Sequence, residues 1–123
     1  MLIDSYGWIE YFIEGPLAEK YAPYVLNANE NSVVTPTIVV YEVYKRLKAE
    51  KGEEVALEAY AQITRTKIVP LDQNSALRAA DVSLTEGLAM ADAIVYSTAK
   101  AYAAELVTSD NHLKRLKGIR FIQ

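Results

Sequence analysis

Four acidic residues, far apart in the sequence, have positions from which they could do chemistry together. Asp4 and Asp110 come just after short apolar runs of the kind that form buried strands. Glu42 and Asp92 lie early in stretches whose apolar spacing is typical of helices. Carboxylates that meet in one cleft repel one another, so their pKa values rise unless a cation is present. The residues therefore indicate a site for a hard divalent cation.

The expected cation is Mg²⁺, because it prefers oxygen ligands and keeps several of its waters, so a few carboxylates suffice. A metal at such a site can stabilise the charge that develops on a phosphodiester and help generate a hydroxide nucleophile. The residues that other kinds of active site would need are absent. The chain has no cysteine, which excludes thiolate zinc sites and cysteine nucleophiles. It has no serine–histidine pair and no phosphate-cradling glycine loop.

Length and composition predict one globular domain that spans residues 1–123. Apolar residues make up 51% of the chain, enough for one sizeable core without disulfides. No apolar run is long enough to cross a bilayer, and the first residues lack the pattern of a signal peptide. Together with the absence of cysteine, these features lead us to expect a soluble, cytoplasmic protein without a membrane partner.

The formal net charge of −3 argues against broad, passive binding to nucleic acid. Positive charge is nevertheless concentrated in two segments, residues 45–51 and residues 114–120. No acidic residue follows Asp110. The two segments are either solvated helix faces or contacts to phosphate, and the sequence leaves both interpretations open.

Five short apolar segments are predicted to be strands. Most are continuous apolar runs, which suits strands covered on both faces, as in a parallel sheet. The segments are Met1–Ile3, Ser32–Val34, Lys67–Val69, Glu105–Thr108 and Arg120–Ile122.

Longer segments between the strands have helical patterns and caps. We expect Ser5 to cap the first helix, and Asp72 or Ser75 to cap the one that ends near Gly87. The remaining predicted helices follow from apolar spacing and from breaks such as Gly15-Pro16 and Gly52. The predicted ranges are 6–13, a second helix to about residue 26, 53–63, 72–87, 91–102 and a short final helix at 111–117.

The segment from Val33 to Val43 contains both strand and helix signals. Its β-branched residues favour a strand, whereas Pro36 argues against a continuous one. We predict a helix capped by Thr35, with Pro36 in its first turn. One face of this helix carries Val39, Val43 and Leu47, so Glu42 falls beside the apolar stripe. Asp92 is expected in the first turn of its helix, facing the positive end of the dipole.

Strands that alternate with helices predict an α/β fold with a doubly wound sheet. Ligands in such folds bind beyond the carboxyl ends of the strands. Asp4 and Asp110 are expected at that edge, and Glu42 and Asp92 follow strands or loops that lead to it. We therefore expect the acids to converge on one rim, although their spacing in the sequence does not force this.

Four segments together resemble the PIN-domain nucleases, in particular the small VapC-like toxin ribonucleases. They are Leu2-Ile3-Asp4-Ser5, Thr37-Ile38-Val39-Val40-Tyr41-Glu42, Met90-Ala91-Asp92-Ala93-Ile94 and Leu106-Val107-Thr108-Ser109-Asp110. Each segment alone is a weak signal, but their order and spacing cover nearly the whole chain.

The resemblance implies a five-stranded parallel sheet flanked by helices, and Mg²⁺- or Mn²⁺-dependent cleavage of single-stranded RNA. Its catalytic and metal-binding positions correspond here to Asp4, Glu42, Asp92 and Asp110. Ser5 and Thr108 match supporting polar residues that hold a carboxylate or a water of the metal. The resemblance leaves three roles open for Asp110: a metal ligand, a base that acts without contacting the metal, or only a helix cap. The resemblance also implies a homodimer and a small antitoxin partner whose tail covers the cleft.

Other interpretations compete with this one. The fold could serve as a catalytically inactive module that binds RNA or protein. Phosphoryl transfer through an aspartate is disfavoured, because Asp4 is followed by Ser5-Tyr6 and not by a second acid. His112 is interpreted as a surface residue of the last short helix. The nine tyrosines are interpreted mainly as packing residues, although aromatic rings also stack on unpaired bases.

Overall fold

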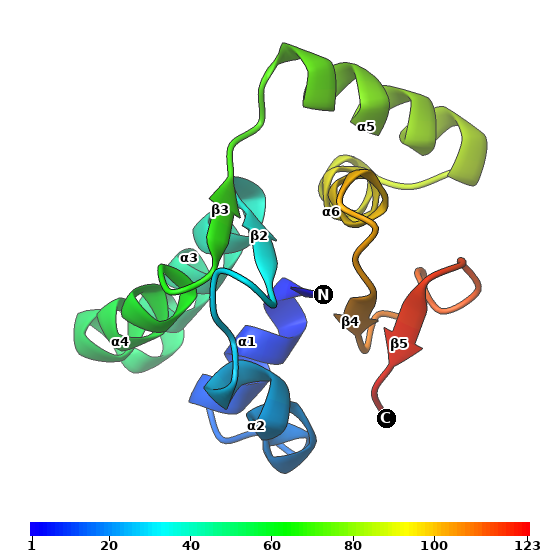
Figure 1. Cartoon of the computed structure of the whole chain (residues 1–123). Coiled ribbons are helices and arrows are strands. Elements are labelled where there is room, and N and C mark those ends of the chain that lie inside the picture. Colours follow the sequence, from blue (N-terminus) through cyan, green and yellow to red (C-terminus); the bar gives the residue numbers. More distant parts are fainter.

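The computed structural model describes all of residues 1–123, and its strands form two small parallel sheets (Figure 1). The first has the order β1-β4-β5, and the second pairs β2 with β3. The strands are β1 (Leu2–Ile3), β2 (Val34–Pro36), β3 (Lys67–Val69), β4 (Leu106–Thr108) and β5 (Ile119–Phe121).

The two sheets meet at the N-terminus of the chain. The backbone N–H of Val34 donates to the carbonyl oxygen of Met1 over 2.9 Å, which places β2 beside β1. No strand ladder continues across this junction. The α/β class and parallel pairing are thus as expected, but the single five-stranded sheet is not confirmed. Short strands explain the division, since β1 has only two residues with which to pair.

Six helices surround the strands. Helices α3 and α4 pack against each other beside β2 and β3. Helix α5 packs across α6 at the opposite end of the molecule (Figure 1). None of them is both long enough and apolar enough to cross a membrane. The helices are α1 (Ser5–Phe12), α2 (Ala18–Leu26), α3 (Thr37–Lys51), α4 (Glu53–Ile63), α5 (Gln73–Glu86) and α6 (Met90–Ala101).

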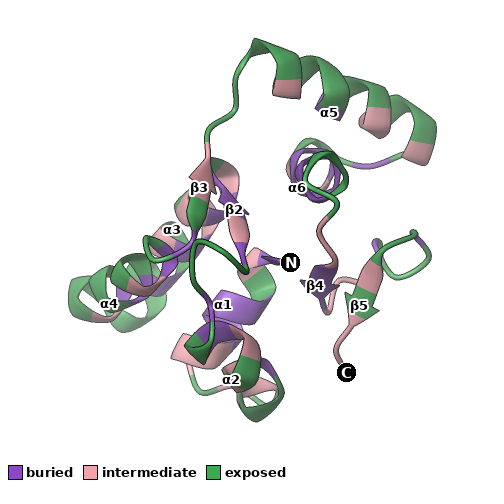
Figure 2. Cartoon of the chain, in the orientation of Figure 1, coloured by how far each residue is buried: buried purple, intermediate pink, exposed green.

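One apolar cluster joins both sheets to the helices. Strand β4 and most of α6 are buried, whereas α5 is mostly exposed and has Ala79 as its buried residue (Figure 2). Trp8 and Tyr21 are the largest side chains that are fully buried. Val39, Val43 and Leu47 form the buried face of α3, as their spacing predicted. A packed core of this kind fixes the strand ends, and hence the residues that follow them.

Two helix starts differ by a residue or more from the predictions. Asp4, and not Ser5, caps α1, because its side chain accepts the N–H of Ser5. Pro36 is the last residue of β2 and not part of a helix, so the predicted strand at residues 32–34 lay two residues too early. At φ −70° and ψ 147° Pro36 has an extended conformation that its ring allows, and α3 begins at Thr37.

The predicted final helix at residues 111–117 was wrong. This segment consists of turns, in which Leu113 N–H donates to Asp110 and Leu116 N–H donates to Leu113, three residues apart each time. The Asp110 side chain accepts the backbone N–H of His112, a turn geometry typical of aspartate. Gly118, at φ +79°, then turns the chain into β5.

Candidate active site

Asp4 lies at the carboxyl end of β1 and is the most buried of the four predicted acids, with 7% of its surface exposed. One carboxylate oxygen accepts the N–H of Ser5 over 2.8 Å, and the other accepts the hydroxyl of Thr108 over 2.8 Å. Strands β1 and β4 pair in parallel with Ile3 opposite Val107, so the next residue along each strand comes together. The sheet itself therefore positions Asp4 against Thr108.

Thr108 connects two of the acids. Its hydroxyl donates to Asp4 and accepts the backbone N–H of Asp110 over 3.0 Å, and the residue is fully buried. Asp110 itself begins the turn that replaces the predicted helix. One of its oxygens lies 2.8 Å from the backbone nitrogen of His112 and 3.2 Å from the Nδ1 atom of the same residue.

Glu42 and Asp92 reach the same edge from helices. Glu42 lies one turn into α3 and Asp92 lies in the first turn of α6, as predicted, and both are half-buried. The two helices contact each other, and the core of the molecule holds them against the strands. The fold therefore brings two helix-borne carboxylates toward two strand-end carboxylates.

The electrostatic interactions among the acids agree with this convergence. Burial raises the pKa of Asp4 to about 6, hydrogen bonds from Thr108 and Ser5 oppose the rise, and the charges of Glu42 and Asp92 add to it. Repulsion between carboxylates has this effect only over short distances.

The other two half-buried acids are affected in the same direction. Burial raises the pKa of Glu42, with the Ser5 hydroxyl opposing the rise and the charge of Asp92 adding to it. Burial also raises the pKa of Asp92, and the charge of Asp110 raises it further, while His112 acts in the opposite sense. Each of the four predicted acids thus takes part in at least one repulsive pair.

The donor atoms at this edge suit a divalent cation. Asp92, Asp110 and His112 each offer a ligand atom, and these atoms lie within 4.8 Å of one another. A hollow of about 440 Å³ opens beside them, lined among others by Asp92, Asn111 and His112. Carboxylate oxygens are what Mg²⁺ and Mn²⁺ prefer, and imidazole suits the transition metals. The crowded carboxylates would bind a cation favourably because it relieves their repulsion.

His112 was interpreted from the sequence only as a surface residue. Its side chain is indeed 85% exposed, but it lies on a turn and not on a helix, and it faces Asp110. The signal in the sequence was its position two residues after an aspartate, where an aspartate turn brings the two side chains together.

Glu10 is a buried acid that does not join the site. It has 5% of its surface exposed, and its side chain accepts the N–H of Leu17 at the connection between α1 and α2. A Cβ atom on Gly15 would lie 2.2 Å from the Glu10 carboxylate, so glycine leaves room for this contact. Glu10 therefore closes a helix connection and has a structural role.

The family model for the PIN domain matches residues 1–119 of the chain. The chain belongs to the PIN domain family. The match includes all four acids, so the acidic edge described above is the edge of a PIN domain.

Solved structures share the PIN fold at low sequence identity. A chain of a toxin–antitoxin complex from Klebsiella pneumoniae has 20% identity and a TM-score of 0.80, with 97% of this chain and 94% of that chain covered. VapC20 from Mycobacterium tuberculosis, described as a toxin that cleaves the sarcin–ricin loop, has 13% identity and a TM-score of 0.71, with 85% and 84% covered.

A third structure extends the comparison. VapBC2 from Rickettsia felis, bound to a DNA fragment from its promoter, has 15% identity and a TM-score of 0.71, with 99% of this chain and 98% of that chain covered. No curated protein matches the sequence. The comparisons thus show a PIN domain whose fold is shared with chains of toxin–antitoxin proteins.

Proposed function

We propose that this PIN domain is a Mg²⁺- or Mn²⁺-dependent endoribonuclease that cleaves single-stranded RNA through Asp4, Glu42, Asp92 and Asp110. One observation carries the proposal: burial raises the pKa values of Asp4, Glu42 and Asp92, and the charges of neighbouring carboxylates at the same edge, Asp110 among them, raise them further. Such crowding costs stability without a cation, so an acidic edge of this kind has no obvious structural benefit.

The residues of the chain have distinct roles in this proposal. Asp4 is the buried anchor of the site, held in one orientation by Thr108 and by the N–H of Ser5. Glu42 and Asp92 complete the donor set from α3 and α6. Asp110 lies at the open rim with His112, next to the hollow through which a substrate would reach the acids.

A divalent cation held by these carboxylates would supply a Lewis acid that stabilises the charge developing on the cleaved phosphodiester. To bind the cation, the carboxylate side chains must be deprotonated at neutral pH, and their oxygens must point toward one another. Thr108 serves both aims, because its hydroxyl donates to Asp4 and its hydrogen bond keeps the pKa of that carboxyl from rising further.

The test is cleavage of a panel of single-stranded RNAs by purified protein, with Mn²⁺ or with EDTA. We expect cleavage that requires the metal and that disappears in Asp4→Asn and Asp92→Asn variants. Asp72→Asn is the matched control, because Asp72 caps a helix on the exposed surface, away from the acids. Cleavage that survives EDTA, or that persists in both site variants, would rule out the mechanism.

We further propose that the protein is the toxin of a toxin–antitoxin pair, which the names of the Klebsiella and Mycobacterium structures support. Expression of the chain alone is expected to slow bacterial growth, and expression of the Asp92→Asn variant is not. Normal growth with well-expressed wild-type protein would contradict the toxin role. Co-expression with a small antitoxin protein is expected to restore growth, because the antitoxin would cover the acidic cleft.

We also propose a homodimer. Helix α5 exposes Leu77 and Leu84, and Met90 at the start of α6 is exposed as well. An apolar hollow of about 380 Å³ lies between the two helices. Exposed apolar surface of this kind favours association. Light scattering on the purified protein is expected to give twice the chain mass, and a monomer at all concentrations would overturn this proposal.

A further inference from the structure

A second, larger hollow lies along α6, next to the one at the acidic edge. It measures about 760 Å³ and runs between the second half of α6 and the turns at residues 115–118. We call it the α6 groove. Its charged lining residues are Glu86, Lys100, Glu105, Arg115 and Lys117.

Arg115 connects the two hollows, because it lines both the α6 groove and the hollow beside Asp92. Asp92 lies in the first turn of α6 and Lys100 lies in the last, eight residues later. At 1.5 Å per residue the two positions are about 12 Å apart along the helix axis. The α6 groove therefore adjoins the hollow beside Asp92 at Arg115 and extends toward the far end of α6.

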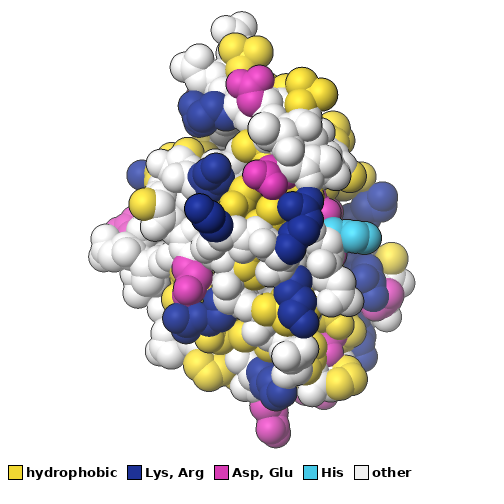
Figure 3. Space-filling view, turned by 90° about the vertical axis from the view of Figure 1, so that its right-hand side faces the viewer, with side chains coloured by type: hydrophobic (Ala, Val, Ile, Leu, Met, Phe, Trp, Pro, Cys, Tyr) yellow, Lys and Arg dark blue, Asp and Glu magenta, His cyan; other side chains and the backbone are white.

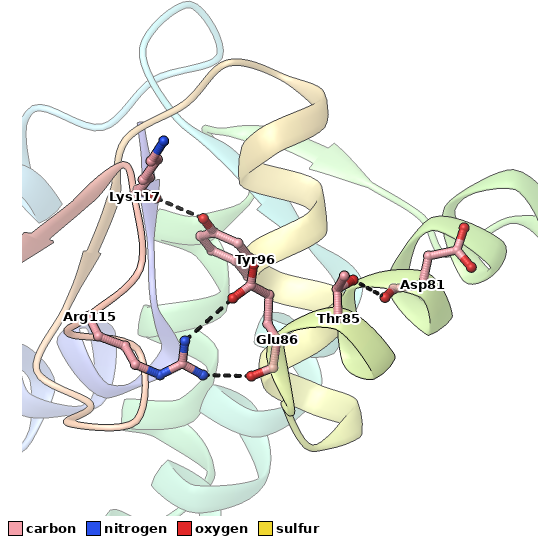
Figure 4. Close-up of polar contacts among 6 residues, drawn as sticks. All are labelled: Asp81, Thr85, Glu86, Tyr96, Arg115 and Lys117. Atoms are coloured by element: carbon pink, nitrogen blue, oxygen red, sulfur yellow. Dashed lines mark hydrogen bonds and ion pairs between the residues drawn. The ribbon is translucent and has the colours of Figure 1, made fainter.

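The lining of the α6 groove is held in place by hydrogen bonds (Figure 4). The hydroxyl of Tyr96 donates to the carbonyl oxygen of Lys117 over 2.9 Å. The guanidinium of Arg115 donates to the carbonyl oxygen of Glu86 over 2.5 Å and lies 3.4 Å from the Glu86 carboxylate. The turns after Asp110 are thereby fastened to α5 and α6, so the groove is preformed.

The α6 groove has a surplus of positive charge although the whole chain is acidic. Glu86 is paired with Arg115, and Glu105 is paired with Arg120 over 2.8 Å. Lys100 and Lys117 are exposed and form no ion pair. The face of the molecule seen in Figure 3 carries many Lys and Arg side chains with Asp and Glu side chains between them, and the single histidine lies at its right-hand margin.

We propose that the α6 groove binds the phosphate backbone of the RNA strand on one side of the cleaved bond. The proposal rests on the proposed ribonuclease function and names the surface that its substrate uses. Lysine ammonium groups bind phosphates as point charges, and Lys100 and Lys117 are available for this. Tyr96, the aromatic residue of the groove, is buried and cannot stack on a base. Binding in the groove is therefore independent of sequence.

The groove also explains how an acidic protein binds an acidic polymer. The four carboxylates repel phosphate until a cation is bound, and the net charge of −3 gives no general attraction. Lys100 and Lys117 in the adjoining groove supply attraction for the part of the strand that extends away from the acids. Binding of the strand at a distance from the cleaved bond lowers KM without any contact to the reacting atoms.

The test measures RNA binding in the Asp92→Asn background, so that no strand is cut. The probe is a short fluorescein-labelled single-stranded RNA of mixed sequence, followed by anisotropy at several salt concentrations. The test variant adds Lys100→Gln and Lys117→Gln. The control adds Arg65→Gln and Arg78→Gln, two exposed cations without ion pairs that change the net charge by the same amount.

We expect the test variant to bind about 25-fold more weakly near ~0.1 M monovalent salt, because each phosphate contact to a single strand contributes a slope of about −0.7 in log K against log salt. The salt slope is expected to become shallower by about 1.4. The control is expected to change neither quantity appreciably. In the background with all four acids, the lysine substitutions are expected to raise KM with little effect on kcat.

Equal losses in the test and control variants would show that only net charge matters and would overturn the proposal. Unchanged binding in the test variant would overturn it as well, as would binding of an acidic peptide through Lys100 and Lys117 without binding of RNA. The outcomes are separate from those for the nuclease. Metal-dependent cleavage with lysine-independent binding refutes only the groove, whereas lysine-dependent binding without cleavage refutes only the nuclease.

Discussion

Asp4 and Asp72 occupy the same structural position in two regions of the molecule and have opposite electrostatic properties. Asp4 caps α1 and Asp72 caps α5, and each side chain accepts a backbone N–H from the first turn of its helix. Burial and neighbouring acids raise the pKa of Asp4 to about 6. The pKa of Asp72 is lowered instead, mainly by the hydrogen bonds from Ser75.

The difference shows what distinguishes a site residue from a structural one in this fold. A helix cap explains the local geometry of both aspartates. Only Asp4 is buried at a strand end where Glu42 and Asp92 also lie. The presence of neighbouring carboxylates, and not the role as a helix cap, therefore distinguishes a residue of the candidate active site. Substitutions at Asp4 and its neighbours and at Asp72 therefore have different expected effects.

The largest expected effect is the loss of cleavage in Asp4→Asn and in Asp92→Asn. Each variant removes a carboxylate from the proposed metal site, and we expect RNA cleavage to fall by more than about 100-fold. Folding is expected to persist, because a neutral side chain relieves repulsion among the acids. Circular dichroism and cleavage assays on the same preparations check both points. Full activity in either variant would show that the substituted residue is not part of the active site.

The next effect is a dependence of metal-free stability on pH. The folded state raises the pKa of Asp4, so it binds this proton more tightly than the unfolded chain does. The resulting stability is fully present below about pH 4 and is lost as the pH rises through about 6. The loss for this group is on the order of 3 kcal/mol.

Denaturant unfolding in EDTA at several pH values measures this dependence. Asp4→Asn is expected to flatten the curve, and Asp72→Asn is expected to leave that part of it unchanged. Mn²⁺ at pH 7 is expected to restore stability to the wild-type protein, because a ligand that binds only the folded state stabilises it. A wild-type protein that becomes more stable between pH 4 and pH 6.5 in EDTA would contradict the account.

Thr108→Val is expected to weaken the site without removing an acid. Valine has nearly the same shape but cannot donate to Asp4 or accept the N–H of Asp110. Loss of such a partner typically reduces metal affinity or activity 10- to 100-fold, and we expect a reduction in that range. Loss of the hydrogen bond is also expected to raise the pKa of Asp4 further, which a pH–rate profile would detect as a shift to higher pH.

The smallest expected effect is that of Asp72→Ala. The variant removes a helix cap and one half of the capping box with Ser75. We expect the melting temperature to fall by about 3–6 °C, with no change in metal binding or cleavage. Reduced metal affinity in this variant would break the comparison, because the two capping aspartates would no longer differ in function.

The sequence predicted the acidic edge because strand ends and first helical turns are defined locally. Asp4 and Asp92 needed only a short apolar run before them or a helical pattern after them. Their convergence was inferred from the geometry of a doubly wound sheet and from the family resemblance, because spacing in the sequence does not determine the order of the strands. The pairing of β1 with β4, which sets Asp4 against Thr108, joins residues about a hundred positions apart.

The sequence failed where a local pattern had two physical solutions. Leu113 and Leu116 have a spacing of three that fits both a helix and successive tight turns. The Asp110 side chain and Gly118 decide in favour of turns. The mistaken helix also concealed the position of Arg115, which lies between the acidic edge and the α6 groove only because the turns fold it back toward Glu86.

The central claim is that crowded carboxylates make a cation necessary, and calorimetric titration with Mn²⁺ tests it most directly. Wild-type protein is expected to bind Mn²⁺ and to release about half a proton from Asp4 at pH 6 but almost none at pH 8, because the cation displaces the proton held by the buried acid. Asp72→Asn is expected to behave like wild type, whereas Asp4→Asn should lose both the binding and the proton release. Wild-type protein that binds no Mn²⁺, or an Asp4→Asn variant that binds it as tightly with the same proton release, would contradict the account.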